Sequence, residues 1–287
     1  MQNFPILGII GGTGVYQFDA ISDLTQTEVS TPFGKPSSPV MTGTLAGKKV
    51  AFLARHGLGH NLSPTEVNYR ANIFALKSMG IRHVISISAC GSLRHDFAPG
   101  DIVIPDQLVD FTKSRKNSFF EGGLVAHVGT ADPFCAHLSS QLFEAVQPTG
   151  ANIHMGGTFV TIEGPRFSTK AESNLFRSWG MSIIGMTASP EAFLAREAEM
   201  CYAAFAHVTD YDVWHQTEDP VTVEMIIKIL HRNAAIAQSA IVNLVSAFEP
   251  QHCECQDALK TALTTSPEAV DHSAKQKLGL LVEKYLP

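Results

Sequence analysis

Short apolar runs recur along the chain with the length and composition of buried strands. Each is rich in valine, isoleucine or alanine and alternates little with polar residues, which is typical of strands covered on both faces. The runs occupy residues 6–10, 50–54, 83–89, 101–105, 157–162, 182–186 and 202–209. We expect these runs to form one sheet.

Helical patterns lie between several of the runs. Over residues 63–80, Ser63 can cap a helix, Pro64 suits its first turn and Gly80 ends it. Further helices are expected over residues 168–179, 190–199 and 222–246. Because strands and helices alternate, the pattern predicts an α/β fold.

The composition agrees with one globular domain. Of the 287 residues, 45% are hydrophobic and 17% are charged, which supplies a large core and differs from disordered chains. No linker rich in proline, glycine or serine divides residues 1–246, which we interpret as a single domain. Residues 247–287 have no strand pattern, and we treat them as a C-terminal extension without an assigned role.

The charge pattern favours neither nucleic acid nor a membrane surface as a partner. The formal net charge is -6, and lysine and arginine do not gather in a block. The N-terminus lacks a signal-peptide pattern, and no apolar run approaches the roughly 18 residues that span a bilayer. We therefore expect a soluble, cytoplasmic protein.

The cysteines form an odd and scattered set, unlike the disulfide framework of a small secreted domain. Cys253 and Cys255, in the sequence HCEC, could chelate a metal or form a strained link. Two cysteines without a second pair are weak evidence for a metal site. We therefore predict no metal. The full set is Cys90, Cys135, Cys201, Cys253 and Cys255.

A glycine-rich loop, GGTG, follows the first apolar run. A dinucleotide-binding loop of the type G-x-G-x-x-G would need glycine at position 17, where the chain has Gln17. What remains is a loop whose backbone can approach an anion closely, with the Thr13 hydroxyl as a donor. The loop therefore favours phosphate over a dinucleotide.

Polar residues follow the other apolar runs at the points where strands should end, and these positions meet at one edge of an α/β sheet. Asp210 and Asp212, in TDYD, would repel phosphate and should face a part of a substrate that offers donors or needs a proton. The remaining side chains are hydrogen-bond donors, with arginine able to hold two oxygens at once, and they suit one compact phosphate. These donors are Thr13, Arg55, His56, Ser88 and Thr187.

Each of these features also has a structural interpretation. The glycines can simply shape a turn, His56 can be a hydrogen-bonded structural histidine, and Asp210 and Asp212 can be turn carboxylates. Phe167 and Met186 are of types that are most often core residues. Their agreement as a set, rather than any one of them, supports a site.

Eight motifs in a fixed order carry a resemblance to a known family. The chain resembles the trimeric purine nucleoside phosphorylase family, and within it the branch that cleaves methylthioadenosine, over about residues 5–245. The motifs are GIIGGTG (8–14), TPFGKPS (31–37), ARHG (54–57), NYRANIFALK (68–77), ACGS (89–92), PGDIVIPDQ (99–107), TIEGPRFST (161–169) and TDYD (209–212).

The resemblance implies a twisted, mixed and partly barrel-like sheet surrounded by helices, a homotrimer, and phosphorolysis of a purine nucleoside. Inorganic phosphate is the co-substrate, and no metal or organic cofactor is needed. The implied phosphate-binding residues are Thr13, Arg55, His56, Ser88, Ala89 (through its N–H) and Thr187. The implied substrate-binding residues are Phe167, Ser168, Met186, Asp210, Asp212, Val223, Ile226 and Ile227, with His127 lent by a neighbouring subunit.

The identity of residue 210 separates two classes of purine. A protonated Asp210 can donate to N7 of the base, and the carboxylate of Asp212 can accept from a 6-amino group. Family members that act on 6-oxopurines typically have asparagine at the position of Asp210. The apolar Val223, Ile226 and Ile227 suit a 5′-thiomethyl group better than a hydroxyl. We therefore expect methylthioadenosine as substrate, with adenine and a sugar 1-phosphate as products.

Two alternatives remain open from the sequence. One is a phosphorylase for 6-oxopurine nucleosides or methylthioinosine, and the other is a catalytically silent protein that binds purines. Ser88 stands where the family more often has threonine, which keeps the hydroxyl and removes a methyl group.

Overall fold

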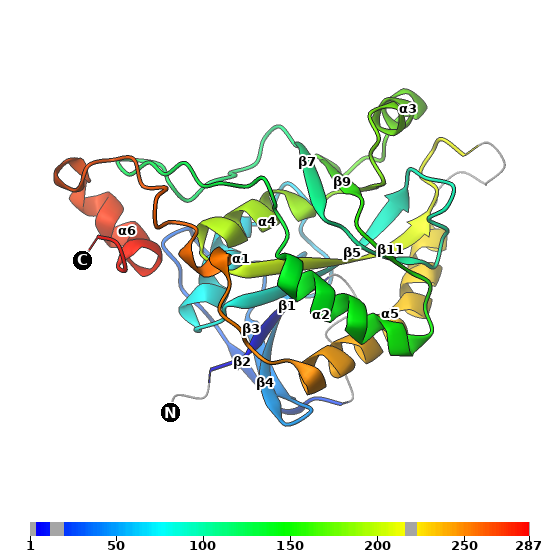
Figure 1. Ribbon diagram of the computed structural model, residues 1–287, viewed down its shortest axis with the longest axis horizontal. Coiled ribbons are helices and arrows are strands. Elements are labelled where there is room, and N and C mark those ends of the chain that lie inside the picture. The colour runs from blue at the N-terminus through cyan, green and yellow to red at the C-terminus, as the bar shows by residue number, and fades with distance from the viewer. Residues whose placement is uncertain (1–3, 12–19, 216–222, 287) are drawn as a thin grey trace.

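The computed structural model of the chain describes residues 4–11, 20–215 and 223–286, and over residues 223–232 it describes the backbone alone. Among these residues, a mixed sheet lies at the centre and helices cover its two faces (Figure 1). This arrangement confirms the predicted fold class.

The sheet contains eleven strands in the described part of the chain. Its main path runs β2-β3-β4-β1-β5-β10-β9-β7, while β11 pairs with β5 and β6, and β8 pairs with β6. The strands are β1 (Leu7–Gly11), β2 (Ser22–Thr27), β3 (Val40–Leu45), β4 (Lys48–Ala54), β5 (His83–Ser92), β6 (Ile102–Ile104), β7 (Gln107–Phe111), β8 (Ile153–Met155), β9 (Thr158–Ile162), β10 (Ile183–Gly185) and β11 (Cys201–Asp210).

Strand β5 is the point at which the sheet branches. Along one side, its first half runs parallel to β1, and its end, at Gly91 and Ser92, runs antiparallel to β10. Along the other side it runs parallel to β11. The sheet therefore forks at β5 and is not closed into a barrel.

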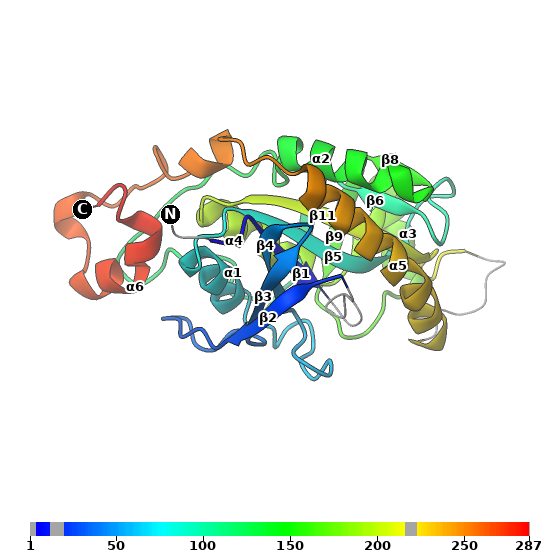
Figure 2. The same cartoon turned by 90° about the horizontal axis from the view of Figure 1, so that it is seen from below.

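Six α-helices are described: α1 (Tyr69–Ser78), α2 (Ala136–Val146), α3 (Lys170–Ser178), α4 (Ala188–Glu197), α5 (Val223–Ala247) and α6 (His272–Val282). Helices α2 and α5 lie side by side on one face of the sheet, and α1 and α4 lie on the other (Figures 1 and 2). None of the described helices is both long and apolar enough to cross a lipid bilayer.

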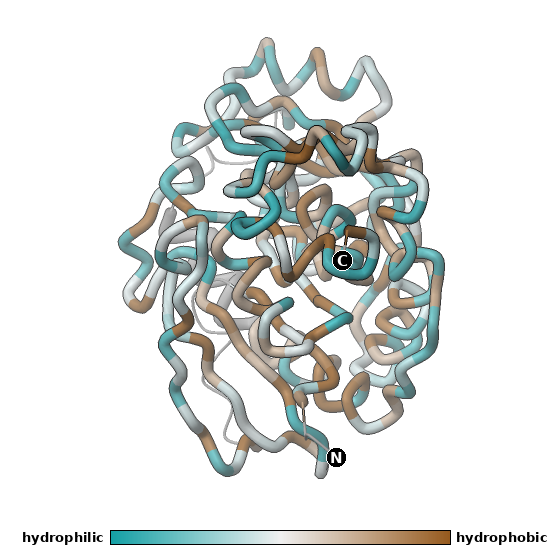
Figure 3. The backbone as a smooth tube through the Cα atoms, turned by 90° about the vertical axis from the view of Figure 1, so that its left-hand side faces the viewer, coloured by the Kyte–Doolittle hydropathy of each residue, from teal (hydrophilic) through white to brown (hydrophobic). Residues whose placement is uncertain are grey.

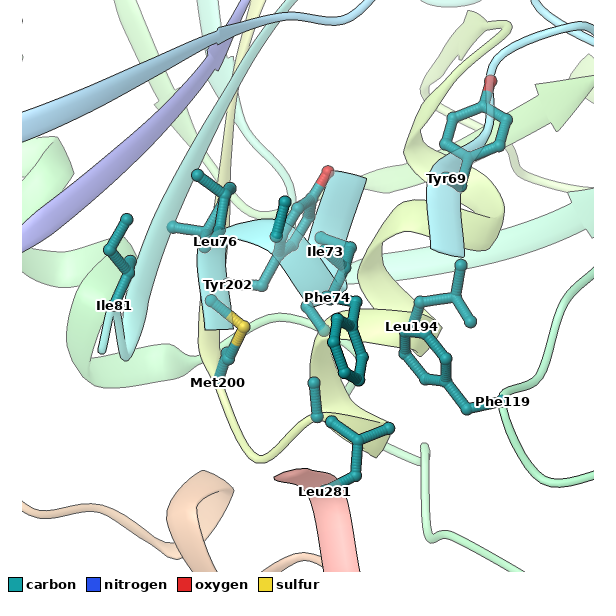
Figure 4. Close-up of a cluster of buried hydrophobic side chains, with 14 of the residues drawn as sticks. Tyr69, Ile73, Phe74, Leu76, Ile81, Phe119, Leu194, Met200, Tyr202 and Leu281 are labelled. Atoms are coloured by element: carbon teal, nitrogen blue, oxygen red, sulfur yellow. The ribbon is translucent and has the colours of Figure 1, made fainter. Parts of the chain in front are cut away.

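Alternate side chains of β11 pack into two hydrophobic clusters, one on each face of the sheet. Tyr202 and Ala204 join the cluster around α1 and α4 (Figure 4), whereas Ala203 and Phe205 join the cluster beneath α2 and α5. A strand has this two-sided burial when helices cover both faces, which explains why its sequence is apolar without alternation.

The start of α1 differs from the prediction of a helix over residues 63–80. The helix begins at Tyr69, and the side chain of Asn68 caps it by accepting a hydrogen bond from the Ala71 N–H at 3.2 Å. Ser63 instead bonds Glu66 in a separate turn, with its hydroxyl donating at 2.6 Å. The prediction of the cap at Ser63 was therefore wrong.

The C-terminal segment, residues 247–286, packs onto the main body. Leu259, Leu278 and Leu281 are buried in the same cluster as Ile73 and Phe74 of α1. Figure 4 shows Leu281 of α6 reaching towards these side chains, and Figure 3 shows the C-terminus in front of the rest of the chain. The segment thus contributes to the core that supports α1.

Candidate active site

Parallel strands bring several predicted site residues to one edge of the sheet. Strands β4, β1, β5 and β11 are parallel neighbours. Arg55 follows the end of β4, Ser88 and Ala89 lie in the second half of β5, and Asp210 ends β11. Strand β10, paired with β5 through Ile184 and Gly91, delivers the segment after it to the same place. The register of the paired strands therefore brings these residues to one edge of the sheet.

Arg55 is directed into the protein. Its side chain is 1% exposed, and its Nε and Nη2 donate to the two carboxylate oxygens of Glu191 at 2.8 and 2.9 Å. Nη2 also donates to Ser86 Oγ at 2.6 Å. Burial alone would lower the pKa of Arg55, but the Glu191 carboxylate raises it above its usual value.

The edge of the guanidinium formed by Nε and Nη2 is thus occupied by Glu191, while Nη1 donates to the Ile87 carbonyl oxygen at 3.2 Å and has a second hydrogen. Phosphate binding by Arg55 stays a prediction. The Tyr202 hydroxyl donates to the same carboxylate at 2.8 Å. The three side chains tie the loop after β4 to α4 and to β11. Sequence reasoning missed Glu191, whose complete burial could not be read from a single acidic residue in MTASPE.

His56 is a neutral imidazole whose proton can be placed. Nδ1 lies 2.9 Å from the carbonyl oxygen of Leu62, so Nδ1 carries the hydrogen, because a carbonyl oxygen can only accept. Burial and the neighbouring charge of Arg55 lower the pKa of His56 to about 4. Its ring stacks on His60 with 4.4 Å between centroids. At neutral pH, Nε2 is therefore a hydrogen-bond acceptor.

Met186 and Thr187 follow β10 and lie beside the second half of β5. A side chain at Gly185 would place its Cβ 3.5 Å from the Ala89 carbonyl oxygen. Thr187 is buried at the start of α4, but its hydroxyl makes no capping hydrogen bond to the helix. A hydroxyl placed beside β5 and not used by the helix is available to a ligand.

Gly164 brings the loop after β9 against Met186. Its φ of +65° favours glycine, and a Cβ there would lie 2.6 Å from the Met186 sulfur. Phe167 follows in the same loop and is 40% exposed, just before α3, which stands away from the body of the molecule (Figure 1). An exposed aromatic ring in this loop is free to stack on a ligand.

Asp210 is a half-buried acid at the end of β11. Its Oδ1 accepts from the Asp212 N–H at 2.7 Å, and its Oδ2 accepts from the Thr209 hydroxyl at 2.6 Å. Burial raises the pKa of Asp210, and the charge of Asp212 adds to the rise. A Cβ at Gly91 would lie 3.0 Å from Asp210 Oδ1 and 3.2 Å from Asp212 Cβ. Only glycine leaves both acids room beside β5.

Asp212 is half-buried, and its Oδ2 atom is buried and unused. Burial raises its pKa, and the hydroxyls of Ser168 and Ser173 lie beside it. Among the described residues, Asp212 Oδ2, Ser168 Oγ and Ser173 Oγ have no hydrogen-bond partner. Because these three polar atoms lie together, they can pair with one another or with a polar ligand, and the site can hydrogen-bond a ligand here.

Arg115 holds two of the site loops together and was not predicted. Its guanidinium donates to the carbonyl oxygens of Ser189 at 2.6 Å and Glu163 at 2.8 Å. A cavity of about 320 Å³ is lined by Arg115 together with Tyr69 and Lys116, and no predicted site residue lines it. Arg115 is therefore a positioning residue behind the site.

The structure keeps one predicted residue apart from the others and leaves four outside its description. His127 is exposed, and its backbone N–H donates to the carbonyl oxygen of Ala262 in the C-terminal segment. This position does not bring it to the edge formed by β5 and β11 of its own chain. Thr13 lies outside the described residues, as do the side chains of Val223, Ile226 and Ile227.

Residues 6–246 match the family model of the phosphorylase superfamily. The chain belongs to this superfamily. The S-methyl-5′-thioadenosine phosphorylase of Geobacter sulfurreducens is 50% identical over 283 residues, which cover 98% of this chain and 99% of the relative. The enzyme of the same name from Gloeobacter violaceus is 52% identical over 286 residues, with coverage of 97% and 95%.

Solved structures of this superfamily share the fold closely. A methylthioadenosine phosphorylase from an antarctic soil metagenomic library has a TM-score of 0.93 at 45% identity and covers 98% of this chain and 99% of its own. A mutant adenosine/methylthioadenosine phosphorylase from Schistosoma mansoni, solved in complex with methylthioadenosine, has a TM-score of 0.80 at 32% identity, with coverage of 97% and 98%.

The similarity continues beyond the expected boundary near residue 245. The family model ends at residue 246, but the Geobacter sulfurreducens relative aligns with 98% of the chain. The C-terminal segment is therefore shared with such relatives, contrary to the expectation that the resemblance leaves it out.

Proposed function

We propose that the protein catalyses the phosphorolysis of S-methyl-5′-thioadenosine to adenine and 5-methylthioribose 1-phosphate. The observation that carries this proposal is the pair of half-buried acids with raised pKa values at the end of β11, beside the half of β5 that holds Ser88 and Ala89. Relatives about 50% identical along almost the whole chain have this activity in their names.

The acid pair acts on the leaving base. Because burial raises the pKa of Asp210 and so favours its neutral form, this side chain can donate a proton to N7 of adenine as the glycosidic bond breaks. The Thr209 hydroxyl can turn to its second acceptor, the Cys90 carbonyl oxygen at 3.2 Å, when Asp210 Oδ2 carries the proton. Asp212 Oδ2 accepts from the 6-amino group, which gives it the partner it lacks within the described residues.

Neutral groups among the described residues supply the main contacts to the phosphate. We assign to it the hydroxyls of Ser88 and Thr187, the Ala89 N–H and the Nε2 of His56. A neutral His56 accepts a hydrogen from the protonated oxygen of phosphate. Positioned phosphate then attacks the anomeric carbon, and its negative charge stabilises the cationic sugar. Thr13 and Arg55 remain predicted contacts of the phosphate, and Arg55 also positions the loop after β4.

We propose that inorganic phosphate is the only co-substrate and that the reaction needs no organic cofactor or metal. Met186 lies against the ribose, Phe167 and Ser168 meet the base, and Val223, Ile226 and Ile227 surround the thiomethyl group. Methylthioadenosine should exceed adenosine by ~1–3 kcal/mol in transition-state binding, the usual worth of a small apolar group.

We propose a homotrimer in which His127 of one subunit completes the site of the next. His127 is exposed in its own subunit, and so are the apolar side chains of Phe111, Leu175 and Trp179 near α3. Light scattering gives the subunit number. In a trimer, His127→Ala should weaken nucleoside binding while leaving the subunit number unchanged. The described cysteines are free thiols, which fits a reducing cytoplasmic compartment.

A substrate panel tests the proposed reaction. Methylthioadenosine, adenosine, inosine and methylthioinosine are each incubated with the protein, with and without phosphate. We expect base release to depend on phosphate and to be fastest from methylthioadenosine. Preference for inosine or methylthioinosine would show a 6-oxopurine enzyme, and stabilisation by nucleosides without base release would show a binding protein.

A further inference from the structure

Four of the five cysteines converge at the end of the sheet remote from the candidate active site. Their Sγ atoms all lie within 4.8 Å of one another. Cys201 and Cys253 are 2.9 Å apart, and Cys135 and Cys253 are 3.9 Å apart. Cys135, Cys201 and Cys255 are buried, and Cys253 is half-buried. The fifth cysteine, Cys90, lies in β5 outside this cluster.

The backbone brings the four residues together from three separate segments. Cys135 precedes α2, and its N–H donates to the Tyr202 carbonyl oxygen at 2.8 Å, which fixes it beside β11. Cys201 is the first residue of β11. Cys253 and Cys255 lie at the start of the short 3₁₀-helix Glu254–Asp257. The convergence is therefore a product of the fold, not of sequence spacing.

The spacing of the sulfurs is that of a tetrahedral metal site. A zinc–sulfur bond of about 2.3 Å gives sulfur–sulfur edges of roughly 3.8 Å. The separation of 3.9 Å between Cys135 and Cys253 matches this edge, that of 2.9 Å between Cys201 and Cys253 is shorter, and all four sulfurs lie within 4.8 Å of one another. A disulfide requires about 2.05 Å and joins the sulfurs two at a time. One ion uses all four sulfurs at once, whereas disulfides do not require all four to meet.

Neighbouring groups stabilise negative charge on the sulfurs. Arg196 donates from Nη1 to Cys255 Sγ at 3.4 Å, and its side chain is itself buried. Cys135 lies at the N-terminus of α2, where the helix dipole favours an anion. These partners offset part of the charge that four thiolates place on a divalent ion.

We propose that Cys135, Cys201, Cys253 and Cys255 bind one zinc ion as a closed tetrathiolate site. Binding replaces the protons of the thiols, which are released to solvent, with four zinc–sulfur bonds, and no electron is transferred. All four positions of the ion are filled by protein, so the site is structural and leaves none for a substrate.

The position of the cluster assigns its role. Cys201 begins β11 and Asp210 ends it, and ten residues of strand span about 30 Å. The ion would therefore not touch the reacting groups. Cys253 and Cys255 open the C-terminal segment, so the ion would fasten this segment to β11 and α2. Its removal should loosen that attachment without changing the chemistry.

Metal content and thiol counting test the proposal together. Protein without a histidine tag, expressed with added zinc and purified without chelator, should contain about one zinc per chain. Cys201→Ser should lose the zinc, while Cys90→Ser, which changes a buried cysteine outside the cluster, should retain it. Cobalt loaded in place of zinc should give the visible bands of tetrahedral thiolate coordination.

Apoprotein keeps the proposal testable if Cys201→Ser does not fold. Zinc added to reduced apoprotein should protect four of its five thiols from a thiol reagent and raise Tm by about 10 °C. Turnover at a temperature where both forms are folded should stay the same. Iron in place of zinc, two disulfides in protein purified without reductant, or reactive thiols at saturating zinc would each overturn the assignment.

Discussion

Asp210 is half-buried and Arg55 is buried at the same edge of the sheet, and burial has different consequences for the two side chains. For Asp210 it favours the neutral acid, because the charged form loses its hydration. Arg55 stays charged because Glu191 lies against it. Asp210 is thus favoured in the protonated form that can donate to a ligand, whereas Arg55 stays charged and paired with Glu191.

Replacing Asp210 with asparagine should remove the proton that the leaving base receives. We expect Asp210→Asn to lower kcat/KM for methylthioadenosine by ~10²–10⁴-fold, the usual effect of losing a general acid. The preference for inosine over adenosine should rise, because the amide NH₂ of asparagine can donate to both N7 and O6 of a 6-oxopurine, whereas adenine has a donor at position 6. Steady-state kinetics measure both effects. Equal kcat/KM values for wild type and variant would contradict the role of Asp210.

The pair of Arg55 and Glu191 can be tested as a structural unit. Arg55→Met leaves a buried carboxylate without its partner and should cost about 3–5 kcal/mol in the free energy of unfolding. Adding Glu191→Met should recover part of this loss. Urea unfolding of both single variants and the double variant measures the coupling. A higher KM for phosphate in Arg55→Met at unchanged stability would instead show direct contact with phosphate.

Among the elements, the apolar strands were predictable because helices cover both of their faces. The runs at 50–54 and 202–209 needed no partner information, and the structure confirms them as β4 and β11. Strand β2 has the sequence SDLTQT and is mostly exposed at the end of the sheet path. It is a strand because it pairs with β3, and its sequence has no apolar pattern from which a strand could be predicted.

The same distinction applies to the candidate site. Asp210 could be placed because it directly follows an apolar run. The partner of Arg55 could not, since Glu191 is 136 residues away and the fold alone brings it near. The cysteine cluster escaped prediction for the same reason, because HCEC supplies two of four thiols and the others come from Cys135 and Cys201.

The cap of α1 gives a prediction at the scale of one element. Asn68→Ala should lower the free energy of unfolding by about 1–2 kcal/mol, because the side chain caps the helix and also donates to the Phe33 carbonyl oxygen at 2.8 Å. Ser63→Ala, the control at the position expected from sequence, should change it by less than about 0.5 kcal/mol. Equal losses in the two variants would contradict this assignment of the cap.

For the whole molecule, Glu197 links stability to pH. Its carboxylate accepts hydrogen bonds from the Phe119 N–H and the Ser118 hydroxyl, yet burial raises its pKa to about 7. The folded state therefore holds this proton more tightly than the unfolded state. The contribution of Glu197 to the free energy of unfolding is therefore fully present below pH 4.5, the usual pKa of the group. It is lost as pH rises through about 7.

Glu197→Gln should remove that pH dependence. The difference in free energy of unfolding between variant and wild type should shift in favour of the variant by on the order of 3 kcal/mol between pH 5 and pH 8. His56 and His207 act below pH 6.5 in both proteins, since burial lowers the pKa of each to about 4. Glu249→Gln, at an exposed position, is the control, and a constant difference for Glu197→Gln would contradict the assignment.

The central claim is that phosphate, not water, attacks the anomeric carbon of the sugar while Asp210 protonates the departing base. Phosphorus NMR of a mixture of protein, methylthioadenosine and inorganic phosphate tests it most directly. The account predicts a new phosphate monoester signal, 5-methylthioribose 1-phosphate, that grows in proportion to the adenine released. Adenine release with an unchanged phosphate signal would show hydrolysis and contradict the account.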